Sequence, residues 1–98
     1  MINVGFFYSV KPGHEKEFEE TFSGVIAYLL GNNTGLKSAK LYRDVSNPLE
    51  YMIFSEWDSK ESFSRFIQSR PFRETTEGGK SILSGHPRHV ILMAERDQ

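Results

Sequence analysis

Four short segments of this 98-residue sequence have the alternation of β-strands, yet they carry bulky apolar side chains on both faces. Phe6 and Phe7 are neighbours in the first segment, and Ile53 and Phe54 are neighbours in the third. Because successive side chains of a strand point to opposite faces, both faces of the resulting sheet are apolar. A sheet with one face in water alternates apolar with polar residues instead. The sequence therefore predicts a sheet that needs to be covered on both sides.

Two segments with helical spacing of apolar residues separate these strands. Phe18 and Phe22 belong to one apolar stripe of the first helix, which is expected over residues 14–30. The second helix is expected to begin at Asp58 as N-cap, with Glu61 three residues later in a capping-box arrangement. The strands are expected over residues 2–10, 36–44, 51–57 and 89–95. The order β-α-β-β-α-β predicts the ferredoxin-like α+β fold, a four-stranded antiparallel sheet with its helices on one face.

The segment before the last strand has a less regular pattern. Pro71 is expected to interrupt the second helix, and residues 72–83 to add a short, irregular helical piece weakened by two consecutive glycines. The sequence leaves open whether residues 71–85 form a lid over a pocket or ordinary connecting structure. Residues 96–98 are expected to be frayed.

Helices on one side leave the second face of the sheet without a cover. An uncovered face would expose an apolar patch larger than monomeric proteins usually tolerate. A second copy of the chain, packed sheet against sheet, would bury that face symmetrically. The pattern therefore predicts a homodimer through the sheet faces; the alternative is a monomer with scattered surface aromatic residues.

Length and composition limit the remaining possibilities. The whole chain, residues 1–98, is expected to form a single domain. Its 12 basic residues are scattered among 13 acidic ones, which argues against a nucleic-acid partner because phosphate binding needs clustered Lys and Arg. Cysteine is absent, so a disulfide framework and a thiolate nucleophile are excluded. No apolar run approaches the roughly 20 residues that span a bilayer, and no signal-peptide pattern is present, so a cytoplasmic protein without a membrane partner is expected.

The chain resembles the antibiotic biosynthesis monooxygenase (ABM) family in three stretches, VGFFYSVKPGHEKEFEE, LYRDVSNPLEYMIFSEWDSKESFSRFIQS and ILSGHPRHVIL. The most specific block runs from Leu41 to Trp57. The resemblance implies a dimeric α+β barrel, and it identifies the fold far better than the reaction. Members of the family include cofactor-independent oxygenases of quinols and polyketide phenols, haem-degrading enzymes, and proteins without an assigned activity.

The resemblance implies a cofactor-free monooxygenase that acts on a small aromatic substrate, a quinol or polyphenol, between the helices and the sheet. Neither a cofactor nor a metal is expected for that chemistry. One alternative is a non-catalytic ligand-binding or stress-associated module on the same fold, since a fold does not fix a function. The other alternative is a haem-binding or haem-degrading protein.

Three residues are candidates for catalytic roles: Trp57 to stack on a ligand and donate its N–H, His89 as the base, and Arg43 as an anion clamp. The candidate substrate-binding residues are Tyr8, Tyr51, Phe6, Phe63 and Phe66. Each also has a purely structural explanation, which is core packing for the aromatic residues. For Arg43 it is a surface ion pair of little energetic consequence.

Metal and haem sites find little support in the sequence. His86 and His89 are three residues apart at a turn, and no carboxylate is spaced to complete a metal triad with them. In staphylococcal-type haem-degrading members, an Asn, a Trp and an axial His occupy the positions that correspond to about Phe6, Phe66 and Thr76. None of the three residue types matches, so the resemblance argues against haem cleavage of that type.

Overall fold

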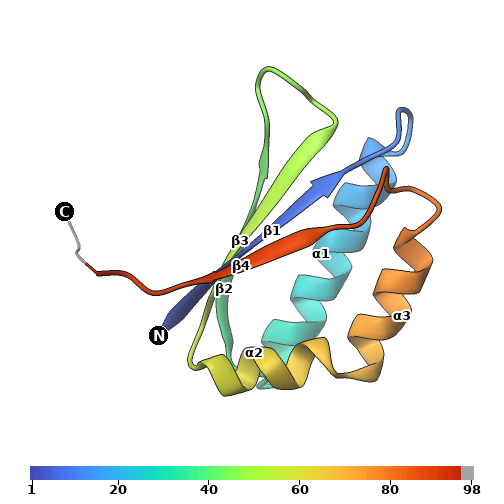
Figure 1. Cartoon of the computed structure of the whole chain (residues 1–98). Coiled ribbons are helices and arrows are strands. Elements are labelled where there is room, and N and C mark those ends of the chain that lie inside the picture. Colours follow the sequence, from blue (N-terminus) through green and yellow to red (C-terminus); the bar gives the residue numbers. More distant parts are fainter. Residues whose placement is uncertain (96–98) are drawn as a thin grey trace.

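The computed structural model describes residues 1–95 as a four-stranded antiparallel sheet with three helices on one of its faces (Figure 1). The elements are β1 (Ile2–Ser9), α1 (Glu15–Gly31), β2 (Leu36–Arg43), β3 (Glu50–Trp57), α2 (Lys60–Ile67), α3 (Arg70–Gly79) and β4 (Arg88–Leu92). The strand order β2-β3-β1-β4 confirms the predicted ferredoxin-like fold. Residues 96–98, which were expected to be frayed, lie outside the described residues.

The central strand β1 sets the geometry of the sheet. It pairs with β3 on one side and with β4 on the other, so that Phe6 lies opposite Ile53 and opposite His89. Alternation along β1 directs Val4, Phe6 and Tyr8 to the face that the helices cover. His89 lies on that same face, because paired residues of neighbouring strands project to one side.

The edge strand β2 contains a β-bulge between Leu36 and Ser38. The bulge adds one residue to β2 and reverses the alternation of its side chains. Leu36 and Leu41, which an unbroken strand would place on opposite faces, therefore both pack toward the helices. The other edge strand, β4, ends at Leu92 and not at residue 95 as expected. Leu92 pairs with Asn3, and β1 begins only one residue before Asn3, so β1 offers almost no further partners to β4.

Two helix starts differ from the prediction. The N-cap of α2 is Ser59, whose hydroxyl accepts a hydrogen bond from the Ser62 N–H at 3.1 Å, and not Asp58. Pro71 does not interrupt a helix but lies in the first turn of α3, after the N-cap Ser69. Proline suits that turn because the first N–H groups of a helix have no partner within it. The predicted irregular piece is therefore a regular ten-residue helix.

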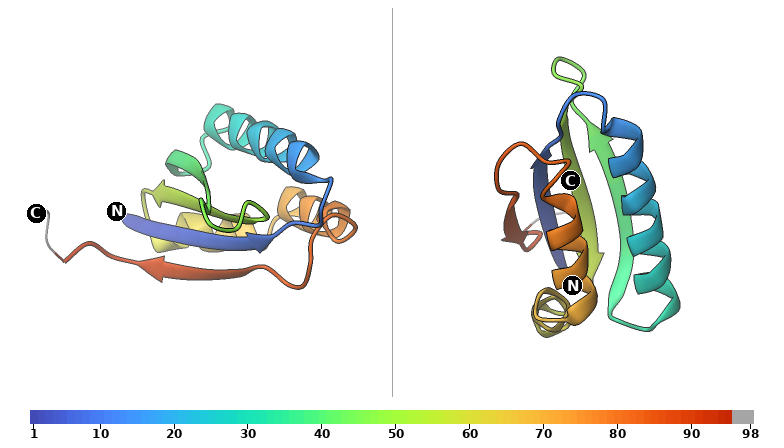
Figure 2. Two further views of the ribbon diagram at one scale, coloured as in Figure 1. Left: turned by 90° about the horizontal axis from the view of Figure 1, so that it is seen from above. Right: turned by 90° about the vertical axis from the view of Figure 1, so that its right-hand side faces the viewer.

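The helices lie as one layer over the sheet. Figures 1 and 2 show α1 and α3 running in opposite directions over the same face, with α2 crossing below them. One buried cluster, which includes Val4, Trp57 and Phe63, joins β1 and β3 to α2. A smaller cluster, which includes Val10 and Ile82, joins the chain after β1 to the segment after α3. Both clusters hold the helices at fixed positions over the sheet.

No helix within residues 1–95 covers the opposite face of the sheet. Tyr42, Phe54 and Leu92 expose between 37% and 48% of their surface there. Phe7 and Met52 lie beside them and are only half-buried. The predicted uncovered apolar face is therefore a feature of the single chain. Among the described residues, no helix combines the length and the apolar character that crossing a bilayer requires.

Gly35 provides a test of the packing between the α1–β2 turn and α2. Its φ is +96°, and a Cβ at this position would lie 2.5 Å from the Cβ of Ser62. We expect Gly35→Ala to lower the free energy of unfolding by about 2–3 kcal/mol, because it combines backbone strain with a clash. The measurement is urea denaturation followed by the fluorescence of Trp57.

The matched control is Gly24→Ala in the middle of α1, where a Cβ meets nothing within 4 Å. We expect this change to raise the free energy of unfolding by about 0.5–1 kcal/mol, since alanine favours a helix over glycine. Equal midpoints for the two variants would contradict the account of the turn.

Candidate functional site

A cavity of about 530 Å³ lies between the helices and the sheet. Its size is within the range of small-ligand sites, which are mostly apolar with a few polar groups. The sheet contributes Phe6, Tyr8, Ile53 and His89, whereas α1 contributes an apolar wall that includes Phe22 and Ile26. Residues of α3 and of the segment after it form the remaining wall: Phe72, Thr75, Thr76, Gly79, Lys80, Ile82, Leu83, Gly85, His86 and Pro87.

Trp57 forms part of one end of this cavity, although only 2% of its surface is exposed. Its indole N–H donates to the Ser55 hydroxyl at 3.1 Å, and that hydroxyl donates to the Val4 carbonyl at 2.9 Å. The rings of Phe63 and Phe66 lie 5.5 and 5.4 Å from it, centroid to centroid. Trp57 therefore presents an aromatic surface to the cavity, while its N–H is already engaged within the fold.

His89 reaches the cavity from β4. Its ring lies 5.2 Å from the ring of Phe6 and 5.6 Å from that of Phe63, which fixes its side of the sheet. The residue is nevertheless exposed, because β4 is an edge strand. His89 is thus an imidazole that both a ligand and solvent can reach.

Tyr8 lies on the floor of the same cavity, between the rings of Phe6 and Phe18. Burial raises the pKa of the Tyr8 phenol to about 12, because the ionised form loses hydration there. Within residues 1–95 the Tyr8 hydroxyl has no hydrogen-bond partner, and it is not cut off from the cavity space. The hydroxyl is therefore a neutral donor available to a ligand.

Arg43 lies away from this cavity, at the end of β2. Its guanidinium is 3.7 Å from Glu15 and 3.9 Å from Glu19, and its Nε–H donates to the Pro48 carbonyl at 2.7 Å. It also lies over the ring of Tyr51, 5.4 Å from the centroid. These contacts join the start of α1 to the edge of the sheet. Arg43 therefore stabilises the structure beside the cavity and does not line it.

Tyr51 and Phe63 also lie outside the cavity lining. The Tyr51 hydroxyl donates to the Glu19 carboxylate. Burial and, after it, this carboxylate raise the pKa of Tyr51 to about 12. Phe63 has no exposed surface and supports the lining from behind. The cavity thus brings together five of the eight predicted residues: Trp57, His89, Tyr8, Phe6 and Phe66.

The sequence interpretation did not include the polar residues that α1 and α3 contribute. Thr21, Thr75, Thr76 and Lys80 all line the cavity. The wall that contains the last three depends on α3 being a regular helix. The sequence does contain a signal for this helix. Ser69 is a good N-cap, and a proline follows two residues later, which together are typical of a helix start.

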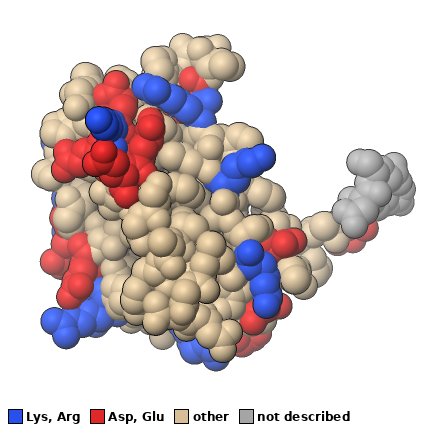
Figure 3. Space-filling model, turned by 180° about the vertical axis from the view of Figure 1, so that it is seen from behind, with Lys and Arg blue, Asp and Glu red and all other residues tan. Residues whose placement is uncertain are grey.

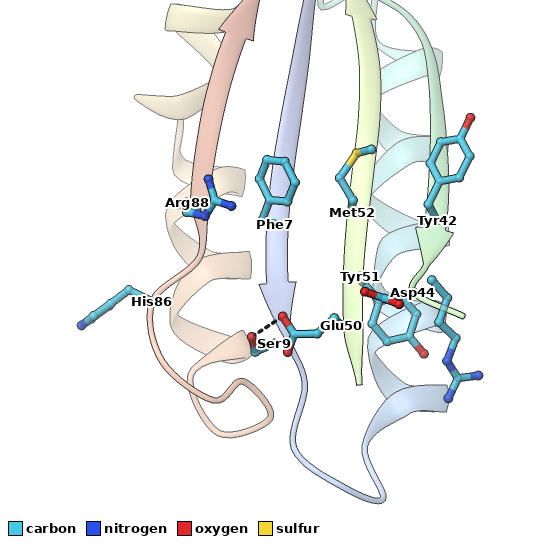
Figure 4. A pocket seen from close by; sticks show the side chains of 10 residues that line it. Phe7, Ser9, Tyr42, Asp44, Glu50, Tyr51, Met52, His86 and Arg88 are labelled. Atoms are coloured by element: carbon cyan, nitrogen blue, oxygen red, sulfur yellow. Dashed lines mark hydrogen bonds between the residues drawn. The ribbon is translucent and has the colours of Figure 1, made fainter. Parts of the chain in front are cut away.

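A second, shallower hollow of about 410 Å³ lies on the uncovered face of the sheet (Figure 4). At its centre Ser9 donates to the Glu50 carboxylate at 2.8 Å. The Arg88 guanidinium lies over the ring of Phe7, 4.2 Å from its centroid. Ser9, Glu50 and Arg88 thus already have partners within the hollow, and the hollow is open to solvent. It is therefore a weaker candidate for a ligand site than the cavity.

Comparison with known proteins identifies the family. The sequence model described as antibiotic biosynthesis monooxygenase matches residues 1–78. The chain belongs to this family. Its fold agrees with that of a conserved protein from Methanosarcina mazei, with a TM-score of 0.82 and 24% identity over 92% of this chain and 88% of the other. A cofactor-independent oxygenase from Streptomyces nogalater has a TM-score of 0.83 and 18% identity, over 98% and 94% of the two chains. These likenesses show the shared fold.

Curated relatives with higher identity come from haloarchaea. A protein of Natronomonas pharaonis named "Putative heme-binding protein" is 38% identical over 89 residues, which are 91% of this chain and 15% of that protein. A relative of the same description from Haloquadratum walsbyi is 35% identical over 89 residues, 91% of this chain and 17% of its own length. The chain therefore spans less than a fifth of these relatives, and their name does not say which part binds haem.

The raised pKa of Tyr8 gives a prediction for stability at high pH. The unfolded phenol ionises near pH 10, whereas the folded phenol keeps its proton until about pH 12. The protonated Tyr8 phenol therefore makes its full contribution to the free energy of unfolding below pH 10. As the pH rises toward 12, this contribution falls by roughly 1–3 kcal/mol. Urea denaturation at pH 8 and pH 11 should show a smaller loss of stability in Tyr8→Phe than in the unchanged chain. The same loss in both proteins would contradict a buried, protonated Tyr8.

Proposed function

We propose that this chain binds a small, flat aromatic molecule in the cavity beneath its helices. The observation that carries the proposal is a cavity of about 530 Å³ lined by the aromatic rings of Phe6, Tyr8, Trp57 and Phe66. Ring-lined walls favour flat aromatic ligands through stacked and edge-to-face contacts. Membership of the family supports this use of the fold.

We further propose that the reaction is a cofactor-independent oxygenation of a quinol or polyphenol by dioxygen. In its simplest form a phenol and O₂ give a quinone and water: one oxygen atom joins the ring and the other leaves as water. The substrate itself supplies all the electrons. The protein then has to bind the ring, remove the phenolic proton and stabilise the resulting anion.

His89 is the candidate base for this proton transfer, because it lines the cavity and is a histidine that solvent can reach. The Tyr8 hydroxyl is the candidate donor to the developing oxyanion, as it remains protonated at neutral pH. Trp57, Phe6 and Phe66 would stack on the ring. Arg43 would act only indirectly, by holding the start of α1.

A binding module without turnover is the alternative on the same cavity. Such a module needs the aromatic walls but neither a base nor an oxyanion donor. The two proposals therefore differ only in the roles of His89 and Tyr8, and the presence of both groups on the cavity supports the oxygenase.

Haem binding is a second candidate, favoured by the names of the haloarchaeal relatives. Phe6, Phe66 and Thr76, at the positions of the haem-associated residues of the family, do line the cavity. None of the three side chains is a haem ligand of the usual kinds. Only His86 and His89 could supply an axial imidazole there, so the residues fit haem poorly at the positions that other members use.

We propose that two copies of the chain pack through their uncovered sheet faces. That face combines the exposed apolar residues Tyr42, Phe54 and Leu92 with charges of both signs, Glu50 and Arg88 among them. A self-complementary face of this kind suits a two-fold axis. The cavity, on the other side of the sheet, would remain available in both subunits.

Oxygen consumption tests the proposed reaction. We expect a panel of hydroquinones and naphthols to include substrates that drive O₂ uptake, with one O₂ consumed for each substrate. His89→Gln should lower kcat by about 100-fold, because general-base catalysis contributes about that much. The control, His14→Gln before α1, should leave kcat unchanged because His14 does not line the cavity.

Two outcomes would contradict the oxygenase. Ligand binding without O₂ uptake across the panel would leave the non-catalytic module. A Soret shift on adding haemin, lost in His89→Ala, would favour the haem candidate instead.

Size-exclusion chromatography with light scattering tests the dimer. We expect twice the chain mass at micromolar concentration, and a rise of at least tenfold in the dissociation constant for Phe54→Glu, which buries unpaired charge at the interface. Tyr28→Glu on the outer face of α1, where Tyr28 is 49% exposed, is the matched control and should not change the mass. A monomeric mass for the unchanged chain would contradict the proposal.

A further inference from the structure

Within residues 1–95, the one charged side chain that lines the cavity is that of Lys80. The titratable lining residues of the cavity are Lys80, His86, His89 and Tyr8. No Asp or Glu within residues 1–95 lines it, although the sequence contains 13 acidic residues. Figure 3 shows the helix side of the molecule, where acidic side chains gather toward the edges and the centre is largely uncharged. Within the described residues, the cavity lining therefore contains no carboxylate that would pair with a cationic ligand.

The Lys80 ammonium lies toward one end of the cavity, together with Tyr8. Lys80 directly follows the C-terminal end of α3, two residues before Ile82, and Tyr8 packs against the buried cluster that contains Ile82. The ring of His89 lies further from this end, 5.6 Å from the ring of Phe63, which is itself 5.5 Å from the ring of Trp57. Leu29, Leu36 and Trp57 line the opposite end. The cavity thus has a polar, cationic end and an apolar end.

The Lys80 ammonium is not neutralised by the fold. Within the described residues, Lys80 forms no ion pair with a carboxylate. Arg43, in contrast, lies near two glutamates outside the cavity. An ammonium group at the mouth of a largely apolar cavity favours a ligand that carries negative charge at the same end.

We infer that the ligand of this cavity is an aromatic acid, with its ring system toward Trp57 and its anionic group at the ammonium of Lys80. This inference rests on the proposed binding function and narrows it from flat aromatic molecules in general to those with a carboxylate or comparable acid. A neutral molecule of the same shape would leave the cationic end of the cavity without a partner.

Two fluorescent probes with one aromatic skeleton test this inference. The anion 8-anilinonaphthalene-1-sulfonate and the neutral N-phenyl-1-naphthylamine differ only by the sulfonate. Both should quench the fluorescence of Trp57, the only tryptophan of the chain, if they enter the cavity. We expect the sulfonate to bind at least tenfold more tightly at low ionic strength, and to lose affinity as salt is added.

Lys80→Met should remove most of this preference and leave the affinity for the neutral probe unchanged. The matched control is Lys16→Met on the exposed side of α1, which should change neither affinity. In competition, naphthoate should displace the sulfonate at a concentration at least tenfold below that of naphthalenemethanol, which has the same ring but no charge.

The outcomes separate this inference from the function on which it rests. If neither probe quenches Trp57, the proposed aromatic cavity site is wrong, and the inference falls with it. If both probes quench Trp57 with equal affinity and Lys80→Met changes nothing, the cavity site stands and the aromatic acid is overturned. A preference for the sulfonate that persists in Lys80→Met would also overturn the assignment of the anionic group to this end.

Discussion

The register of β1 between β3 and β4 is the constraint on which the rest of the structure depends. It sets Phe6 between Ile53 and His89 and thereby fixes the floor of the cavity. The hydrogen bonds from Trp57 to Ser55 and from Ser55 to Val4 join β1 and β3 at one end of this floor. A shift of β1 by one residue would turn its apolar residues to the uncovered face and remove the floor altogether.

The fold was predictable because it depends on patterns that repeat along the chain. Alternation marked the strands, and helical spacing marked α1. The uncovered apolar face followed from Phe7 and Phe54, and the exposure of Phe54 in the single chain agrees with that expectation. By contrast, no local pattern marks the β-bulge of β2, since it depends on how Leu36 meets its neighbours. Asp58 and Ser59 are both good N-caps, and only the approach of Ser62 decides between them.

The candidate site was predictable only in part, for a related reason. Trp57, Tyr8 and Phe6 lie on strands, where alternation assigns each side chain to a face. Arg43 also ends on the helix side of the sheet, yet it turns to the glutamates at the start of α1 rather than to the cavity. That choice depends on the distance between two elements far apart in sequence, which no spacing within either element contains. The threonines and Lys80 depended in turn on recognising α3.

The cavity and the uncovered apolar residues lie on opposite faces of the sheet, and one loop borders both. The residues that line the cavity, from Tyr8 to Lys80, lie on the helix side, while the exposed apolar residues Tyr42, Phe54 and Leu92 lie on the other. His86 is the exception, because it lines both the cavity and the shallow hollow on the uncovered face. A second copy packed on that face would therefore meet the loop that also borders the cationic end of the cavity. Since that loop leads directly into β4 and His89, a partner that fixes it would also fix the imidazole that the proposed chemistry needs.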